Sequence, residues 1–380
     1  MLSSPTNGAI GIATKPTLRW QGVSGASMYR IMVATAQSAL PTDPASARCT
    51  KCLINTTSTA TSFTPSTALN SGAVYFWQVR AEGGSAKGGY WSQQRSFTTI
   101  PAGSGVVSIT SVTPGAVIND FSVLVRGFVN VPFGTEVGVT VNGFPALVDQ
   151  GQFALIVPLD DTVTGLTAVA RDAMGTTLGS QTIPVTVQIP TEEPILLFRP
   201  LPFMGMAPLS VSFELRSLEP IARIDLDADG NGTVDFQGTK LDNQQFVYSG
   251  PGLYFPKVTV TDTANRIYTK TAVLLVVAQN ELEALLQAKW TGLKDALRNG
   301  DIPTALKYIA ISKRSDYSQV FSSLYIPLAQ IDQVLTNITF IVMNRATAEY
   351  EMLRTDPQGE VAYLVRFNID EDGIWRIRDF

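Results

Sequence analysis

The sequence predicts a mainly β protein in which three tandem β-sandwiches are followed by a C-terminal α+β domain. Glycine (30) and proline (22) are spread over the 380 residues without a period, which is typical of many turns between short strands. Apolar and polar residues alternate until a change of pattern near Glu281. Beyond it, Leu282, Leu286, Trp290 and Leu293 recur at helical spacing, so helices are expected there.

The division into four segments rests on two linkers and on this change of period. Proline and small residues between strand-like runs predict linkers at residues 98–105 and 189–194. We therefore expect domains at residues 1–100, 101–190, 191–279 and 280–380, each able to fold independently. Sandwich domains of about 100 residues are usual.

The composition excludes several function classes. The chain has no histidine, which rules out Ser-His-Asp and Cys-His nucleophilic sites and His-ligated metals. The eight basic and two acidic residues of 1–100 give that segment a charge of +6 without a Lys/Arg cluster, so no nucleic-acid partner is predicted. No apolar run approaches the roughly 20 residues of a membrane span, and no leader follows Met1. We expect a protein that is not an enzyme.

The first segment carries a recognisable set of core residues. They are Trp20, the Gly25-Ala-Ser-Met-Tyr29 stretch, and Leu69, which stands six residues before Tyr75. On these residues, the segment from 5 to 99 resembles a fibronectin type III domain. The resemblance implies a tyrosine corner, in which the phenol hydroxyl of Tyr75 bonds back to the chain.

Two cysteines lie close together in the long loop between residues 36 and 55. A redox Cys-x-x-Cys motif needs a helix N-terminus in a βαβ setting, and the sequence shows neither around Cys49 and Cys52. We interpret the pair as a small structural disulfide of an exported protein, worth about 2 kcal/mol for so short a loop. Free thiols, or a redox or metal site, are the alternatives.

The second segment reads as strands of five to seven residues joined by turns. Asn142-Gly143 predicts a type I′ hairpin, because both central residues of that turn need positive φ. The order Thr113-Pro, Val125-x-Gly127, Val157-Pro-Leu159 and Arg171-Asp-x-x-Gly175 resembles Ig-like spacers of bacterial surface proteins and of polysaccharide-degrading enzymes.

Two stretches of the third segment, Ala207–Phe213 and Pro251–Asp262, are strand-like. On these residues, which match the opening and closing strands of the family, the segment resembles a polycystic kidney disease (PKD) domain. The aromatic-Asp-Phe-Gly-Asp-Gly signature of the family is replaced here by an acidic stretch from Ile224 to Asp235.

This acidic stretch follows the spacing of an EF-hand calcium loop. Ligand positions 1, 3, 5, 7 and 9 are taken by Asp227, Asp229, Asn231, the carbonyl of Thr233, and Asp235. The twelfth position holds Gly238 instead of glutamate and no helices flank the loop, so we expect weak calcium binding, with Asp225 or Asp242 as a further ligand. The alternative is an acidic turn that solvates its charges.

The fourth segment combines helices with strands. Asn299-Gly300 ends one predicted helix, and Asp301-Ile-Pro starts the next. The stretch Trp290–Asp301 and the ending Asp372–Phe380 resemble nuclear-transport-factor-2-like domains, in which helices pack into a curved antiparallel sheet. Such domains sometimes hold a ligand pocket.

Two groups of side chains bear on such a pocket. Glu349 and Glu351 share one strand face, and we expect a solvated ladder with Arg366, Arg376 and Arg378 rather than a ligand-facing pocket. A second set of aromatic residues lies at helical spacing and is expected in the core; it comprises Tyr308, Tyr317, Phe321 and Tyr325.

Together these features predict a bacterial extracellular or cell-surface protein with a structural or adhesive role, whose partner is a protein or a glycan. We expect the chain to be part of a larger modular protein or a form trimmed of its leader. One alternative is a polysaccharide-binding accessory region, which needs a row of exposed aromatic residues drawn from Tyr90, Trp91 and Tyr254. The other is a small-ligand-binding or catalytic C-terminal domain, which needs a deep pocket.

Overall fold

The computed structural model describes residues 2–5, 7–44, 46–86, 89–101, 105–131, 135–191, 196–323, 330–357 and 359–380. Within these ranges the chain is mainly β, and no α-helix precedes Gln279. The predicted fold class is therefore confirmed. Both predicted linkers fall partly outside the described residues.

The first segment forms two sheets that face each other. Its strands are β1 (Leu2–Ser4), β2 (Ala9–Ile12), β3 (Leu18–Trp20), β4 (Tyr29–Ala34), β5 (Cys52–Ser58), β6 (Ser62–Phe63), β7 (Val74–Ala81) and β8 (Arg95–Thr99). The sheet orders are β1-β3-β6 and β2-β8-β7-β4-β5. Trp20, Tyr29 and Trp77 lie in the shared core. The hydroxyl of Tyr75 accepts a hydrogen bond from the N–H of Asn70 (2.8 Å), as the tyrosine corner requires.

The second segment is again built of two sheets. Its strands are β9 (Val107–Ile109), β10 (Ala116–Ile118), β11 (Ser122–Val129), β12 (Val137–Val141), β13 (Phe144–Pro145), β14 (Leu147–Asp149), β15 (Gln152–Pro158), β16 (Gly165–Asp172) and β17 (Thr177–Val187). The sheet orders are β10-β17-β16-β12-β13 and β14-β15-β11-β9. Asn142 and Gly143, with φ of 49° and 84°, make the tight turn between β12 and β13, as their sequence predicts.

The third segment contains three smaller sheets around one core. Its strands are β18 (Leu196–Leu201), β19 (Met204–Met206), β20 (Leu209–Ser217), β21 (Ile221–Asp227), β22 (Phe236–Gly238), β23 (Phe246–Tyr248), β24 (Gly252–Tyr254), β25 (Lys257–Asp262), β26 (Ile267–Thr271) and β27 (Leu274–Val277). The sheet orders are β18-β20-β23, β19-β27-β24 and β22-β21-β25-β26. Phe198, Val211, Ile224 and Val260 are among the buried residues that join these sheets.

The fourth segment packs helices against a four-stranded antiparallel sheet. Its elements are α1 (Gln279–Arg298), α2 (Ile302–Lys307), α3 (Arg314–Ser322), α4 (Ile331–Val334), β28 (Ile338–Asn344), β29 (Thr347–Asp356), β30 (Gly359–Ile369) and β31 (Trp375–Asp379), with the strands in sequential order. The carboxylate of Asp301 accepts a hydrogen bond from the N–H of Thr304 (3.0 Å), which caps α2 as predicted. Trp290 is almost completely buried, and its Nε1 donates to the carbonyl of Thr336 (2.8 Å).

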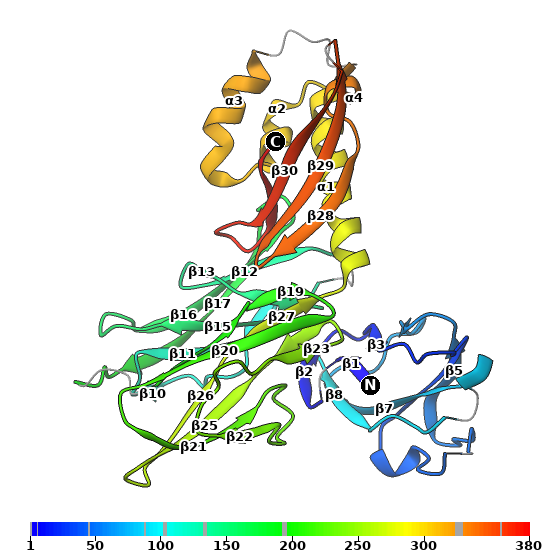
Figure 1. The fold of residues 1–380 in the computed structure, drawn as a ribbon, viewed down its shortest axis with the longest axis vertical. Helices are drawn as coiled ribbons and strands as arrows, with labels where there is room; N and C mark the ends of the chain where they lie inside the picture. The colour runs from blue at the N-terminus through cyan, green and yellow to red at the C-terminus, as the bar shows by residue number, and fades with distance from the viewer. Residues whose placement is uncertain are drawn as a thin grey trace.

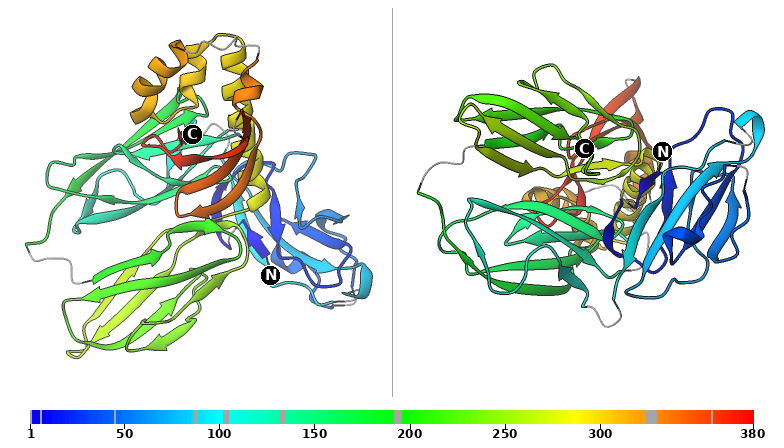
Figure 2. Two further views of the ribbon diagram at one scale, coloured as in Figure 1. Left: turned by 45° about the horizontal axis from the view of Figure 1, so that its top comes forward. Right: turned by 90° about the horizontal axis from the view of Figure 1, so that it is seen from below.

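The three sandwiches lie side by side, and the fourth segment sits across them (Figures 1 and 2). One apolar cluster crosses the segment boundaries: Met204, Leu253 and Leu275 of the third segment pack in the same cluster as Leu286 and Trp290 of α1. Segments with small polar contacts usually move relative to one another. The shared apolar cluster fixes the third and fourth segments against each other instead.

Ion pairs that are wholly or partly buried connect further segments. The guanidinium of Arg19, on β3, lies 3.6 Å from the carboxylate of Asp149 on β14 and also pairs with Glu281 at the start of α1. The ammonium of Lys289, on α1, lies 2.5 Å from the carboxylate of Glu136 in the second segment. Burial raises the pKa of Glu136 and lowers that of Lys289, and the attraction between the two charges opposes both shifts.

Removing one member of the Lys289–Glu136 pair should destabilise the whole chain. In Lys289→Met the carboxylate of Glu136 stays buried without its partner, so we expect the free energy of unfolding to fall by about 3–5 kcal/mol. The double variant Lys289→Met/Glu136→Leu should recover much of that loss, because no unpaired charge remains. Chemical denaturation of the three proteins measures both effects.

The control is Lys313→Met, which breaks the exposed contact with Asp316 (3.6 Å). Exposed pairs contribute about 0–1 kcal/mol. A Lys289→Met protein as stable as the control variant would contradict the structural role of the buried pair.

Candidate functional site

The acidic stretch forms the loop between β21 and β22, and its backbone conformation requires glycine. Gly230 has φ of +75°, and a Cβ there would lie 2.6 Å from the carbonyl oxygen of Phe255. A larger residue would therefore be strained and would displace Phe255. The loop therefore packs closely against the backbone of Phe255 at Gly230.

The carboxylate of Asp227 organises the loop. Its Oδ1 accepts hydrogen bonds from the N–H groups of Gly230 (2.8 Å) and Asn231 (3.0 Å), and its Oδ2 accepts one from Gly232 (2.7 Å). The carboxylate of Asp235 accepts a bond from the N–H of Ala228 (2.7 Å). These bonds fold the chain back so that its acidic side chains converge.

Three of the five predicted ligand residues come together. One carboxylate oxygen each of Asp227, Asp229 and Asp235 lie within 4.8 Å of one another. Burial raises the pKa of Asp229, and the charges of Asp235 and Asp227 act in the same direction. A carboxylate has about four lone-pair positions, so these groups keep capacity beyond their N–H bonds, and oxygen ligands of this kind suit calcium.

The other predicted ligands are placed differently. The side-chain oxygen of Asn231 accepts a bond from the N–H of Thr233 (2.7 Å), and its amide nitrogen donates to Asp229 (3.0 Å). Asp225, considered as a further ligand, pairs with Arg223 (2.7 Å) and is not a member of the carboxylate group, nor is Asp242.

A half-buried cation, Arg95, lies near the acidic loop. Burial lowers the pKa of Arg95, from β8 in the first segment, and the neighbouring Tyr254 and Asp229 oppose that shift. The guanidinium also donates to the carbonyl of Ser3 (3.1 Å). Sequence reasoning missed Arg95, because it lies in another segment more than 130 positions before the loop. Its charge partly offsets that of the loop, which weakens the attraction for a metal ion.

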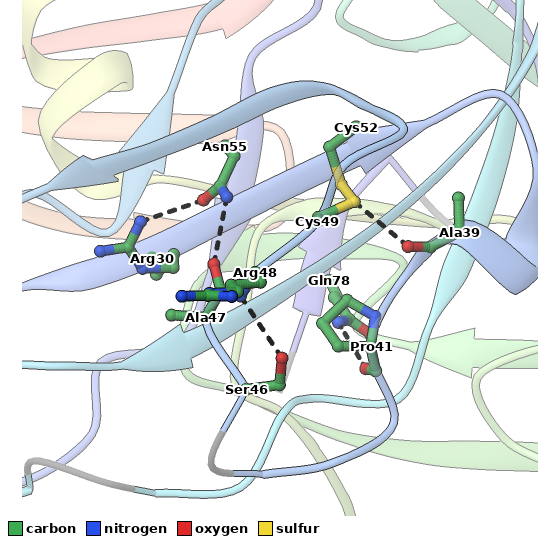
Figure 3. Close-up of a disulfide and its surroundings, with 10 residues drawn as sticks. All are labelled: Arg30, Ala39, Pro41, Ser46, Ala47, Arg48, Cys49, Cys52, Asn55 and Gln78. Carbon is green, nitrogen blue, oxygen red and sulfur yellow. Dashed lines mark hydrogen bonds between the residues drawn. A yellow bond between two sulfur atoms is a disulfide. The ribbon is translucent and has the colours of Figure 1, made fainter.

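The cysteine pair closes a small loop in the first segment. Cys49 and Cys52 form a disulfide (Figure 3). It lies over a minor apolar cluster that includes Met32, Leu40 and Trp91. The side chain of Gln78 donates to the carbonyl of Pro41 (2.9 Å), and that of Asn55 donates to Ala47 (3.2 Å), so strand side chains hold the long loop in place.

The aromatic row expected for polysaccharide binding is not formed. Tyr90 is 84% exposed, but Tyr254 is only 8% exposed, and its hydroxyl donates to the carbonyl of Gly250 (2.9 Å). The face of Trp91 is covered by the guanidinium of Arg80, 4.6 Å from the ring centre. Tyr254 is buried because its strand, β24, faces the core of the third segment.

The predicted charge ladder is correct for one arginine and wrong for another. Arg366 lies 3.1 Å from Glu349 and 3.2 Å from Asp379 across the sheet. Arg376 is 1% exposed and is not part of that ladder, because the carboxylates of Asp370 and Asp372 bind it at the β30–β31 turn. Arg378 lies 4.0 Å from Asp379.

The interior of the fourth segment is filled with apolar side chains in its described part. Trp290, Tyr350 and Phe367 are buried there, and the ring of Tyr317 stacks on that of Phe380 (4.9 Å between centres). Phe321 is buried and Tyr308 packs at the edge of the same cluster, as predicted, while Tyr325 lies outside the described residues. A groove of about 390 Å³ lies elsewhere, between this segment and the second sandwich.

Comparisons with known proteins identify no family. No protein-family model matches the chain, and no curated protein matches it. Among solved structures, the fibronectin(III)-like modules of Clostridium thermocellum CbhA are 15% identical, covering 46% of this chain and 95% of theirs with a TM-score of 0.19. SGBP-B of the Bacteroides ovatus mixed-linkage glucan utilization locus, solved with a mixed-linkage heptasaccharide, is 10% identical. The match covers 73% of this chain and 68% of that one, with a TM-score of 0.16.

The four N-terminal Ig domains of Dscam1 are 12% identical, covering 73% of this chain and 77% of that one with a TM-score of 0.23. At such identities and TM-scores the similarity carries no conclusion about function. No helix among the described residues is both long and apolar enough to cross a membrane.

The disulfide gives a testable prediction. Alkylation of the chain purified without reductant, followed by intact-mass analysis, should modify neither Cys49 nor Cys52. The variant Cys49→Ser/Cys52→Ser should lose about 2 kcal/mol of unfolding free energy, because the short loop is no longer closed. Two alkylated thiols in freshly purified protein would contradict the structural role.

Proposed function

We propose that this chain is a non-enzymatic structural or adhesive protein of a bacterial surface or secreted assembly. Its units are residues 1–100, 101–190 and 191–279, of fibronectin-like, Ig-like and PKD-like type, and a nuclear-transport-factor-2-like unit at 280–380. The observation that carries the proposal is the junction of the four segments, where buried ion pairs and a shared apolar cluster hold the sandwiches side by side.

A fixed cluster of this kind suits the display of loops to a protein or glycan partner. Free domains on linkers change their relative orientation, whereas a buried charge pair keeps its geometry because separation leaves a charge unpaired. The disulfide agrees with an oxidising compartment outside the cytoplasm. Loops on different segments are then presented at constant spacing, which favours binding of an extended partner at several points.

Exposure on intact cells tests this proposal. Brief trypsin treatment of intact cells of the source bacterium should release peptides of this chain, while a cytoplasmic marker enzyme stays undigested. A strain lacking the chain should adhere less to the surface or matrix on which it grows, and the purified chain should bind to that material. A chain that trypsin reaches only after lysis would overturn the proposal.

The acidic loop is proposed as a weak calcium site within this assembly. Asp227, Asp229 and Asp235 supply carboxylate oxygens, and a cation there replaces their mutual repulsion with attraction. The missing twelfth-position glutamate leaves part of the coordination to water, so we expect a dissociation constant near the millimolar range of extracellular modules.

Thermal unfolding of the full chain with calcium and with chelator measures this binding. Calcium at a hundred times its dissociation constant should add about 2.7 kcal/mol to the stability of the state that binds it. The Asp229→Asn variant should have the same melting temperature with calcium as with chelator. The control Asp225→Asn, whose side chain pairs with Arg223 outside the group, should keep the calcium-dependent difference.

The rise in melting temperature that calcium causes should also become smaller on acidification. Calcium and protons compete for the carboxylates. Because the pKa of Asp229 is raised, its carboxylate takes up a proton at a higher pH than an ordinary aspartate does. The calcium-dependent rise in melting temperature should therefore be fully present near neutral pH and be lost on acidification at a higher pH than an ordinary aspartate would give. Equal melting temperatures in calcium and chelator, up to about 10 mM calcium, would leave only an acidic turn.

A further inference from the structure

The groove between the second sandwich and the fourth segment has the size of a small-molecule site. Its volume of about 390 Å³ falls in the usual range of about 300–1,000 Å³ for ligand pockets. Thr140 and Arg171 line it from β12 and β16. Arg314 lines it from the start of α3, and Glu371 from the β30–β31 turn.

The two walls of the groove are held together closely. A Cβ on Gly138 of β12 would lie 2.3 Å from the carbonyl oxygen of Asp372, so only glycine allows this approach. The N–H of Trp375 donates to the carboxylate of Glu136 (3.0 Å), which also binds Lys289. The groove is therefore a built feature of the junction, with little reorganisation needed for a ligand to bind.

One of the three arginines of the groove is already engaged. The guanidinium of Arg376 makes two parallel bonds to Asp372 (2.5 and 2.7 Å) and a third to Asp370 (3.1 Å). Its Nε donates to the carbonyl of Lys307 (3.1 Å). Its charge is balanced within the protein, so it forms the floor of the groove and not a ligand group.

The other two arginines keep free hydrogen-bond donors. Arg171 donates one bond to the hydroxyl of Thr140 (3.2 Å), and Arg314 donates one to the carbonyl of Ile309 (3.3 Å). Neither takes part in an ion pair with a residue of the described ranges. Burial lowers the pKa of Arg314, and the nearby charge of Arg376 acts in the same direction, while Asp370 and Asp372 oppose it. Glu371 and Asp372 also act on these two arginines through their charges, so an anion would be held by the free guanidinium donors rather than by a net positive charge.

We propose that the groove binds a small ligand through an oxyanion, either a carboxylate, a sulfate or a phosphate, held between Arg171 and Arg314. A guanidinium presents parallel N–H donors that match such groups. The groove is larger than the anion alone, so the ligand has an organic body that lies along Met174 and Ile311, while Thr140 and Glu371 are available to its hydroxyl groups. This site does not depend on the proposed surface role of the chain.

Calorimetric titration of the full chain tests the site with three probes: inorganic sulfate, inorganic phosphate and glucuronate. Glucose, which resembles glucuronate without the carboxylate, is the matched neutral control. At least one anion should bind saturably, and the pattern among the three distinguishes an inorganic anion from a sugar acid. Arg171→Gln and Arg314→Gln should each weaken that binding about tenfold or more, as expected for loss of a charged hydrogen bond.

The control variant is Arg216→Gln, at an exposed position that pairs with Glu214 away from the groove, and it should bind like the unaltered protein. Arginine modification by phenylglyoxal gives an independent measurement on the unaltered chain, in case the groove variants do not fold. The bound anion should protect Arg171 and Arg314 but not Arg216. Absence of both heat and protection with all three anions would overturn the proposal, as would binding that survives both substitutions or equal binding of glucose.

Discussion

The guanidinium of Arg19 is the point on which the arrangement of the molecule depends. It extends from the first segment to Asp149 of the second and to Glu281 of the fourth. Burial raises the pKa of Asp149, and the attraction of Arg19 opposes that shift, so the cation favours the charged form of this carboxylate. Buried pairs of this kind add little net stability, but an incomplete pair is costly. The contact therefore selects one relative orientation of the segments among those that apolar packing alone would allow.

The packing of the segments determines which residues surround each of the two candidate sites. The groove exists only where β12 and β16 meet the β30–β31 turn, so its two free arginines would face open solvent in the separated segments. The acidic loop is folded by its own N–H bonds, yet its electrostatic environment includes Arg95 of the first segment. The groove is therefore formed by contact between segments. The acidic loop is formed by its own segment, and the neighbouring segment changes only its electrostatic environment.

Local patterns predicted the elements well, because strand alternation, helix caps and turn residues act within a few positions. Asn142-Gly143 and the Asp301 cap are found where the sequence indicates them. The burial of Arg19 could not be read in this way. Alternation in β3 assigns Leu18 and Trp20 to the core and Arg19 to the opposite face, and nothing local shows that other segments cover that face. The error over Tyr254 has the same origin, because its burial depends on the packing of three sheets.

The arginines of the groove show why such a site has no sequence motif. Arg171 and Arg376 are more than 200 positions apart, and they line one cavity only because the second and fourth segments are in contact. Both residues are arginines, so residue type does not show which of them is structural and which can bind a ligand. Arg376 has two aspartates within six positions of it in its own turn, so its charge is neutralised locally. Arg171 donates its described hydrogen bond to a threonine and makes no ion pair within the described residues, so its guanidinium keeps donors for a ligand. The distinction between a structural and a ligand-binding arginine is therefore decided by the partners that the fold brings to each.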